Sequence, residues 1–162
     1  MRPSIIQLKQ LVFQRIIVGT AKPLEEVSSG EAANFDFNGV NFRTTLEVGA
    51  PPSESEDDRT FIVSLGIVVD SSEGKAVPYK LDLNALGVIE VSDEVENEAR
   101  ADLAAVNGAS IIYGAIRELV STLTSRCIPG SLLLPTMDFR DHLKKRPAES
   151  SPDAKKQPRC SK

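Results

Sequence analysis

The stretch Asn107–Phe139, NGASIIYGAIRELVSTLTSRCIPGSLLLPTMDF, decides the fold. Its first part predicts an amphipathic helix, because apolar residues recur at helical spacing over a broad face. These residues are Ile112, Ile116, Leu119 and Leu123, with Tyr113 and Val120 widening the stripe. Cys127 to Gly130 end the helix, and a short apolar run then leads into Pro135. Such a helix needs an apolar surface to pack on, which the rest of the chain must supply.

The residues before the helix predict that surface as four strands. The first is Leu11 to Val18, which is rich in β-formers. Between Asn34 and Val48 the alternation changes phase at Asn38-Gly39, which indicates a bulge or turn. Clean alternation of apolar and polar residues follows from Phe61 to Val69 and again from Val77 to Val91. The pattern is typical of an antiparallel sheet with one apolar face.

The order of these elements predicts the fold class. Ser92 or Asp93 can cap the long helix, and Asn107-Gly108 is a weak point within it. After Pro135, residues 138–145 predict one or two further helical turns. We therefore expect an α+β fold, a four-stranded antiparallel sheet with a long helix and a short C-terminal helix packed on one face. Residues 1–143 form this domain, and residues 144–162, which have no apolar periodicity, are predicted to be a disordered basic tail.

Composition is that of one soluble globular domain, with 41% hydrophobic and 26% charged residues among 162. The two cysteines, Cys127 and Cys160, lie in different contexts, which favours a reducing cytoplasm over secretion. Gln and Lys residues interrupt the apolar N-terminus, so no export signal is predicted. No stretch approaches the roughly twenty apolar residues of a membrane helix. We expect a cytoplasmic protein without membrane insertion.

Charge is unevenly distributed along the chain. From Arg140 onward there are eight Lys or Arg and three Asp or Glu, a net charge of +5. Since the whole chain carries −4, residues 1–139 carry −9. An acidic body argues against a nucleic-acid partner, because phosphate contacts need Lys and Arg. It suits a partner with basic patches, or simply keeps the chain soluble.

Residues typical of catalysis or metal binding do not form a recognisable site. The sequence has no Gly-rich phosphate loop, CxxC pair or HExxH motif. The single histidine, His142, stands beside the tail, and Cys127 follows a helix C-terminus, the wrong end to stabilise a thiolate. The acidic loop around Asp57-Asp58 could hold a cation, but solvation explains it more simply. We predict no enzyme activity, no cofactor and no metal.

Three stretches together resemble a known family. They are YKLDLNALGVIEV (79–91), the helix ASIIYGAIRELVSTLTSR (109–126) with Arg117-Glu118 and Ser125-Arg126 in register, and LLLPTMDF (132–139), which is similar to LLLPPVNF. Their order and spacing resemble the SecB protein-export chaperones, over roughly Leu11 to Leu143. The resemblance implies a homotetramer, a dimer of dimers with the long helices packed between two sheets.

The resemblance also implies unfolded polypeptide clients, held without ATP in grooves between the sheet edge, the crossover loop and the C-terminal helix. Binding such chains needs apolar surface and unpaired backbone groups. The groove candidates are Phe35, Phe37, Leu132, Leu133, Met137 and Phe139, each of which would equally suit the core. The small, polar helix side of Ser110, Gly114 and Ser121 would permit close contact between subunits, or would face water.

The sequence departs from the family pattern at several positions. Cys127 replaces the usual Gly after Ser-Arg, and Pro129 stands one place early. Lys80 stands where the family has an apolar residue two positions before an acid, a pair implicated in docking the motor protein SecA, so only Asp82 matches. The basic tail also differs from the family's acidic or polar C-terminus.

Three functions remain open from the sequence. The first is a general export chaperone that delivers preproteins to SecA. The second is a SecB-like chaperone with a dedicated client, such as the antitoxin of a toxin–antitoxin pair. The third is a structural or adaptor oligomer without chaperone activity. Lys80 and the basic tail favour the second function, and the abundance of export chaperones in the family favours the first.

Overall fold

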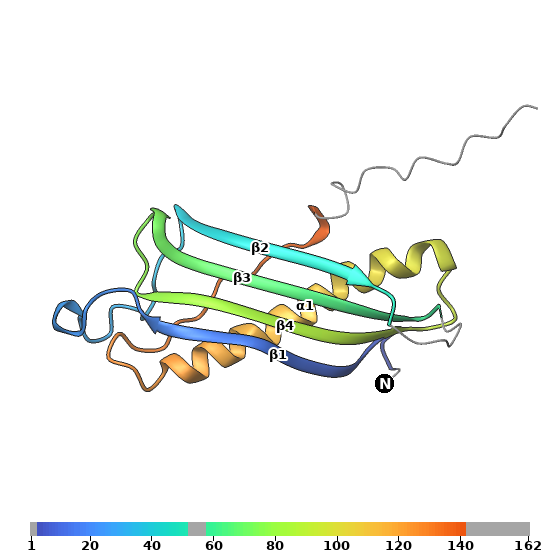
Figure 1. The fold of residues 1–162 in the computed structure, drawn as a ribbon, viewed down its shortest axis with the longest axis horizontal. Coiled ribbons are helices and arrows are strands. Elements are labelled where there is room, and N and C mark those ends of the chain that lie inside the picture. Colours follow the sequence, from blue (N-terminus) through green and yellow to red (C-terminus); the bar gives the residue numbers. More distant parts are fainter. Residues whose placement is uncertain (1–2, 52–57, 142–162) are drawn as a thin grey trace, which may run out of the picture.

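The fold is one antiparallel sheet with a long helix on one face (Figure 1). The structure, a computed structural model, describes residues 3–51 and 58–141. Its strands lie in the order β1-β4-β3-β2, so β1 and β2 form the two edges. The elements are β1 (Ile6–Thr20), the short 3-10 turn η1 (Leu24–Glu26), β2 (Val40–Gly49), β3 (Thr60–Gly74), β4 (Tyr79–Val91) and the helix α1 (Asn97–Thr124).

Alternation in β3 and β4 builds the core, as the sequence predicts. Every second residue of β4 from Tyr79 to Val91 is buried under α1, and the residues between them lie on the opposite, open face of the sheet. β3 pairs with β4 so that Leu65 stands opposite Ala85, which keeps the buried sets of both strands on the same face. The predicted phase change at Asn38-Gly39 is confirmed, since Gly39 has a φ of 83° and β2 begins at Val40.

Two glycines let α1 approach the sheet closely. A Cβ on Gly108 of the helix would lie 3.0 Å from Val63 and 3.1 Å from Ile89. A Cβ on Gly87 of β4 would lie 3.0 Å from Ile112. The helix is continuous through the predicted weak point at Asn107-Gly108. Gly108 therefore serves helix–sheet packing, not a break in the helix.

The start of α1 differs from the prediction, because the helix begins at Asn97 instead of at Ser92 or Asp93. The amide of Ser92 donates a hydrogen bond to the Ile5 carbonyl, which extends the pairing beside β1. The Ser92 hydroxyl accepts a hydrogen bond from the amide of Glu94, so it caps a turn instead of the helix.

A buried arginine fixes the first turns of the helix. Arg100 is only 7% exposed, and its Nε donates to the Val95 carbonyl over 2.9 Å. Its guanidinium also contacts the Asp58 carboxylate at 2.8 Å, which joins α1 to the residues before β3. These contacts stabilise a helix start that has no side-chain cap.

At the C-terminal end of α1, the buried residues also differ from the predicted apolar stripe. Leu123 is 41% exposed, whereas Thr124 is fully buried. The Thr124 hydroxyl donates to the Val120 carbonyl over 2.7 Å and accepts a hydrogen bond from the amide of Leu132 over 2.8 Å. Because its hydroxyl is hydrogen-bonded, Thr124 can occupy the core position that the spacing of apolar residues assigns to Leu123.

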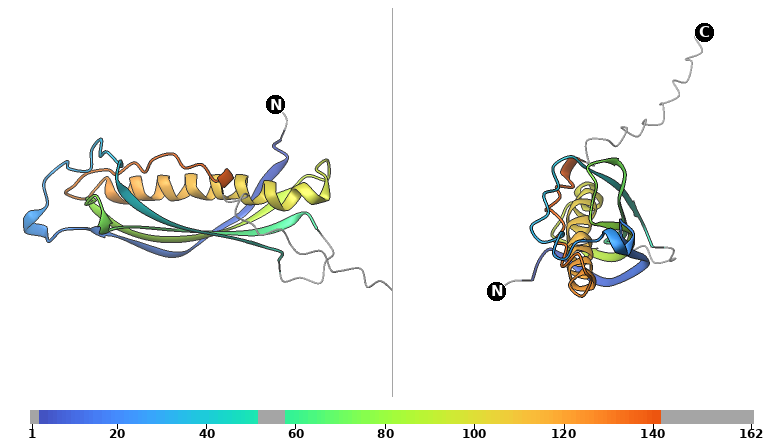
Figure 2. Two further views of the ribbon diagram at one scale, coloured as in Figure 1. Left: turned by 90° about the horizontal axis from the view of Figure 1, so that it is seen from above. Right: turned by 90° about the vertical axis from the view of Figure 1, so that its left-hand side faces the viewer.

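The described residues contain no second α-helix, so the short C-terminal helix that was predicted to pack on the sheet is not found among them. Residues 131–139 instead run in extended form beside α1 (Figure 2). Pro135 and the hydrogen bonds that the segment makes to side chains favour this extended form. Of the predicted helix 138–145, only residues 138–141 are described, and the predicted tail 144–162 lies outside the described residues.

Helix α1 is long and apolar enough in composition to cross a membrane. In this fold its apolar side packs on the sheet, with Ile112, Ile116 and Val120 fully buried. It is therefore the core helix of the domain.

Candidate functional site

An aromatic cluster lies where the crossover loop between β1 and β2 meets the sheet. The rings of Phe35 and Phe37 are 5.1 Å apart at an angle of 87°, and Phe37 lies 5.6 Å from Phe42 of β2. All three side chains are half-buried. The Lys75 ammonium stands 5.0 Å from the centre of the Phe35 ring, a cation–π contact. Edge-to-face contacts of this kind hold the rings in place while leaving part of each exposed.

The extended C-terminal segment, residues 131–139, is held to α1 by side chains. The Tyr113 hydroxyl donates to the Pro135 carbonyl over 2.6 Å, and Arg117 Nε donates to the Leu134 carbonyl over 2.9 Å. The Ser121 and Ser131 hydroxyls lie 3.0 Å apart. The segment is therefore positioned by side chains of α1, without a strand partner among the described residues.

The crossover loop and the start of the C-terminal segment are joined directly. The amides of Gly30 and Ala32 donate to the carbonyls of Ile128 and Pro129 over 3.2 and 2.8 Å. The Tyr79 hydroxyl, at the start of β4, donates to the Gly130 carbonyl over 2.8 Å. Figure 2 shows the two segments running along the same side of the molecule as α1. These hydrogen bonds fix the crossover loop to the start of the C-terminal segment at one end of the site.

Both tyrosines of the chain are buried, and their ionisation can be measured. Burial raises the pKa of Tyr113 to about 12. Burial, with smaller contributions from Cys127 and Glu31, raises the pKa of Tyr79 to about 12. We expect tyrosinate absorbance of the native protein to rise near pH 12, against about 10 in denaturant. Because the unfolded chain ionises first, stability present below pH 10 falls as the pH rises to 12. Native titration of either phenol near pH 10 would contradict this burial.

The six predicted groove residues do not share one environment. Leu132 and Phe139 are 1% and 2% exposed and pack in the core, where Phe139 contacts Tyr113 at 5.7 Å between ring centroids. Leu133 is 63% exposed, and Met137 is half-buried. Alternation explains why Leu133 is exposed between the buried Leu132 and Leu134, and Phe139 is buried because it packs against Tyr113. Leu133 and Met137, together with the half-buried rings of Phe35 and Phe37, are the members of the set that remain accessible.

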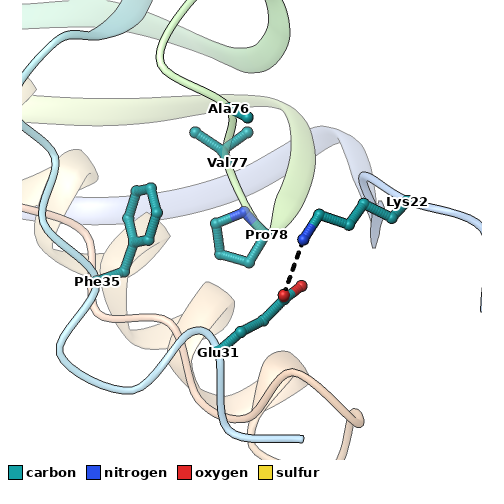
Figure 3. Close-up of a pocket in the computed structure, with 6 residues that line it drawn as sticks. All are labelled: Lys22, Glu31, Phe35, Ala76, Val77 and Pro78. Atoms are coloured by element: carbon teal, nitrogen blue, oxygen red, sulfur yellow. Dashed lines mark hydrogen bonds and ion pairs between the residues drawn. The ribbon is translucent and has the colours of Figure 1, made fainter. Parts of the chain in front are cut away.

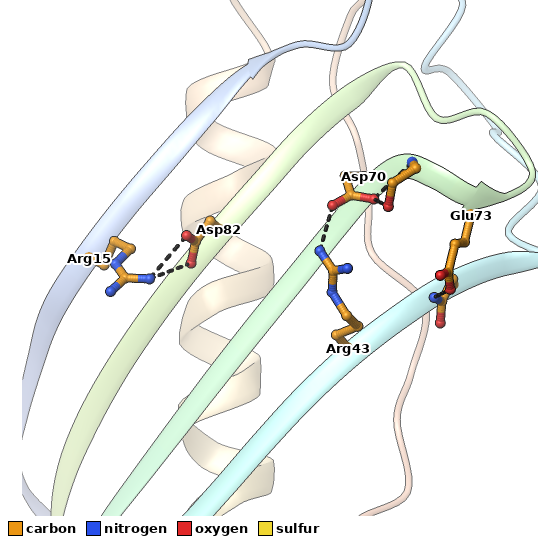
Figure 4. Close-up of polar contacts among 7 residues, drawn as sticks. Arg15, Arg43, Asp70, Glu73 and Asp82 are labelled. Carbon is orange, nitrogen blue, oxygen red and sulfur yellow. Dashed lines mark hydrogen bonds and ion pairs between the residues drawn. The ribbon is translucent and has the colours of Figure 1, made fainter.

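The residues considered for SecA docking lie on the open face of the sheet, and one of them already has a partner. Lys80 is exposed at the start of β4, and Asp82 is two residues further along the same face. Arg15 of β1 contacts both carboxylate oxygens of Asp82, at 3.1 and 3.3 Å (Figure 4). This pair reduces the negative potential that Asp82 presents to a basic partner.

Two further carboxylates of the open face are paired in the same manner. Lys9 contacts Glu90 at 3.0 Å, and Arg43 of β2 contacts Asp70 of β3. Hydrogen bonds from the hydroxyl and amide of Ser72, together with Arg43, hold the pKa of Asp70 below its usual range. Each of these exposed pairs contributes little to stability, because water screens the two charges. Their common effect is to make the open face nearly neutral.

The three residues predicted at an oligomer interface lie on the outer side of α1, but in different surroundings. Ser110 and Gly114 are exposed, and a Cβ on Gly114 would meet nothing within 4 Å. Ser121 is half-buried because it contacts Ser131 of the C-terminal segment. The first two therefore offer a free surface, and the third supports the segment.

No group of three or more His, Cys, Asp or Glu residues suited to a metal ion occurs within residues 3–51 and 58–141. Most of the acidic loop and His142 lie outside these ranges. Cys127 is exposed and has a free thiol. The described candidate site thus consists of apolar surface and backbone groups.

Comparison with solved structures identifies the fold. A SecB-like chaperone of Mycobacterium tuberculosis, Rv1957, solved in complex with a ChAD peptide from the Rv1956 HigA1 antitoxin, matches with a TM-score of 0.53 and 19% identity, over 82% of this chain and 91% of that chain. The chain has the SecB-like fold. A Streptococcus agalactiae protein of unknown function matches with a TM-score of 0.45 and 13% identity, over 80% and 96% of the two chains. No protein-family model and no curated protein matches the sequence.

Several residues that organise this SecB-like fold were missed by the reasoning from sequence. Thr124 and Tyr79 hold the C-terminal segment by hydrogen bonds. Only Thr124 had a signal in the sequence, because it is a polar residue within the apolar stripe of the helix. Glu31 and Lys22 form an ion pair at the base of the crossover loop, for which no local pattern exists. The exposure of Val12, Ile16 and Ile17 on β1 was not predicted, since alternation alone does not say which face is covered.

Proposed function

We propose that this protein is an ATP-independent chaperone that holds unfolded polypeptides. The observation that carries the proposal is the accessible apolar surface formed by the Phe35–Phe37 cluster and by Leu133 and Met137 of the extended segment. An unfolded chain offers apolar side chains and unpaired backbone groups, which suit such a surface and an extended segment. The SecB-like fold supports the same function.

Oligomerisation is part of the proposal. β1 is a fifteen-residue edge strand whose outer backbone has no partner among the described residues, and Val12, Ile16 and Ile17 on it are 42%, 48% and 55% exposed. A long apolar edge of this kind is a hazard unless another strand covers it. We propose that β1 pairs with β1 of a second copy, which would continue the sheet, and that such dimers join through α1 into a tetramer.

Helix α1 has a second exposed apolar surface, on the flank that the C-terminal segment leaves uncovered. Ile111 and Leu123 are 37% and 41% exposed, and with the half-buried Leu119 they form one row at four-residue spacing. The C-terminal segment lies along the opposite flank of α1, the one with Tyr113 and Arg117. The uncovered row therefore supports contact between copies.

Of the two client classes, the open face of the sheet favours a dedicated client. Docking of SecA through Asp82 would require that carboxylate to exchange Arg15 for a partner, and the neighbouring Lys80 adds a positive charge. The Mycobacterium tuberculosis chaperone of the same fold was solved with an antitoxin peptide. We propose a specific cytoplasmic client, such as an antitoxin, with delivery of preproteins to SecA as the alternative. Direct binding of purified SecA separates the two.

Suppression of aggregation tests the holding function. We expect the wild-type protein to prevent aggregation of a chemically unfolded model client at stoichiometric ratio without ATP. The double variant Phe37→Ser with Leu133→Ser should need about ten-fold more protein, because each buried apolar side chain contributes about 1.5–3 kcal/mol. Leu24→Ser, which alters a residue 64% exposed on η1, is the matched control and should act as wild type. A wild-type protein that does not suppress aggregation at this ratio would instead support the adaptor function.

A further inference from the structure

The sequence contains two Asn-Gly pairs, and the fold places them in opposite surroundings. Asn38-Gly39 lies in the crossover loop just before β2, and both of its residues are exposed. Asn107-Gly108 lies within α1, where Asn107 is half-buried and Gly108 is buried. An asparagine side chain can react with the backbone nitrogen that follows it, and glycine has no side chain to obstruct the approach. The surroundings therefore decide which pair reacts.

Asn38 and Gly39 are the two central residues of a tight turn. The amide of Val40 donates to the Phe37 carbonyl over 3.1 Å, which closes the turn. Gly39 has a φ of 83°, whereas the φ of Asn38 is negative, and this combination is that of a type II turn. The Gly39 amide and the Asn38 side chain form no hydrogen bond with the described residues. Both reacting groups are therefore free of contacts that would hold them apart.

The reaction open to this pair is closure of a five-membered ring. Hydroxide removes the proton from the Gly39 nitrogen, which then attacks the side-chain carbonyl carbon of Asn38. A C–N bond forms, and the side-chain nitrogen takes up a proton and leaves as ammonia, which gives a succinimide. Water then opens the ring at either of its two carbonyl groups, and the product is aspartate or isoaspartate. Attack within one chain is fast wherever the two atoms can be brought into line.

Helix α1 prevents the same reaction at Asn107. The Nδ2 atom of Asn107 donates to the Leu103 carbonyl over 3.0 Å, which holds the side chain against the preceding turn. The amide of Gly108 belongs to the hydrogen-bonded backbone of the helix. Gly108 also packs closely against Val63 and Ile89 of the sheet. Ring closure there would require the helix to open over the core.

We propose that Asn38-Gly39 is a site of spontaneous deamidation, at which Asn38 is converted to aspartate and isoaspartate while Asn107 stays intact. The only other reactants are hydroxide and water, which reach an exposed turn directly. The inference goes beyond the proposed function and holds whether or not the protein binds unfolded chains. It assigns a chemical role to an Asn-Gly pair that the chaperone function does not use.

The reactive turn is joined to the aromatic cluster through Lys75. The Lys75 amide donates to the Gly39 carbonyl over 2.8 Å. Its ammonium contacts the Asp36 carboxylate at 3.1 Å and lies 5.0 Å from the centre of the Phe35 ring. Figure 3 shows Phe35 facing residues 76–78, which lead from Lys75 into β4, across a small pocket. A change in the turn therefore reaches the Phe35 side of the cluster.

Deamidation would change both the length and the charge of this turn. Isoaspartate carries the main chain through the former side chain, which adds one backbone atom between Phe37 and Val40. The 3.1 Å hydrogen bond that closes the turn cannot then keep its geometry. Both products also add a negative charge near Asp36, which already pairs with Lys75. The aromatic cluster would thus keep its original form only for a limited time.

Ageing of the native full-length chain tests the inference. The protein is incubated at mildly alkaline pH and digested with trypsin, and the peptides that contain Asn38 and Asn107 are compared by mass spectrometry. Resistance to an aspartate-specific protease distinguishes isoaspartate from aspartate. We expect Asn38 to convert at least about ten-fold faster than Asn107, because α1 must first open. In guanidinium chloride, which unfolds the helix, the two residues should convert at similar rates. Native conversion of Asn38 no faster than that of Asn107 would overturn the inference.

A variant and an internal reference complete the test. Asn38→Gln keeps the amide but needs a six-membered ring, so the gain in mass of the loop peptide should slow at least about ten-fold. An unchanged gain in this variant would place the reaction at another residue and overturn the inference. Asn34 is also exposed in the same loop but precedes Phe35, and it should stay intact. Equal conversion of Asn34 and Asn38 would show that exposure alone decides the reaction, against the role of the turn.

Discussion

Replacing Gly108 by leucine should lower the free energy of unfolding by about 3 kcal/mol or more. Even a Cβ at this position would lie 3.0 Å from Val63 and 3.1 Å from Ile89, which are both fully buried. The remaining atoms of leucine would have to push α1 away from the sheet over the centre of the core, where packing is dense. Chemical denaturation followed by circular dichroism measures the loss.

Gly114 supplies the matched control for Gly108 on the same helix. A Cβ there meets nothing within 4 Å, so Gly114→Ala should raise the free energy of unfolding by about 0.5–1 kcal/mol through helix propensity. Gly108→Ala shares this gain, but its crowded Cβ should offset it. If Gly108→Leu were as stable as the wild type, α1 could not lie as close to Val63 as the structure places it.

A single charge on β1 should dissociate the proposed oligomer. Ile16 is 48% exposed on the helix side of this edge strand, opposite Leu83 of β4. Ile16→Asp would remove an apolar side chain from each copy and bury a carboxylate at the contact. Losing about 1.5–3 kcal/mol per side chain in two copies weakens association a hundred-fold or more. Light scattering after size exclusion should change from an oligomeric to a monomeric mass, while circular dichroism stays native.

Leu24→Asp is the control for this experiment. Leu24 is 64% exposed on η1 and belongs neither to the paired residues of β1 nor to α1, so the same change in chemistry should leave the oligomer intact. An unchanged oligomeric mass for Ile16→Asp would exclude β1 as the contact. A wild-type protein that is monomeric at micromolar concentration would contradict the oligomer itself.

The sheet could be predicted largely because its two central strands are covered on one face only. Phe61 to Val69 and Tyr79 to Val91 alternate cleanly, and the structure confirms the side that each residue takes. The first strand was predicted too short, since β1 runs from Ile6 to Thr20. Its apolar residues fall on both faces, with register shifts between Leu8 and Gln10 and between Phe13 and Arg15. Alternation cannot predict an edge strand that is bulged in this way.

The ends of the helix were harder to predict because long-range contacts set them. Ser92 has the composition of a cap, yet its amide pairs with Ile5, which is distant in the sequence. Leu123 fits the apolar spacing, yet Thr124 is buried, since it also bonds the amide of Leu132. In both cases a tertiary hydrogen bond outweighs a local preference of a few tenths to about 1 kcal/mol.

The candidate site was predicted in part. The pattern identified the segments that carry it, but it treated Leu132, Leu133 and Phe139 as equivalent. Their exposed fractions are 1%, 63% and 2%, because Leu132 and Leu133 alternate in an extended backbone while Phe139 packs against Tyr113. The Glu31–Lys22 pair was not predicted, because its two residues are nine positions apart in a loop without periodicity.

The way in which the C-terminal segment is held has a consequence for the order of folding. Carbonyl groups of the segment accept from Tyr113 and Arg117 of α1, and the carbonyl of Gly130, just before it, accepts from Tyr79 of β4. Those donors take their final positions only after α1 lies on the sheet. The segment therefore settles only after α1 has packed on the sheet, so the side chains that it exposes come into place once the core has closed.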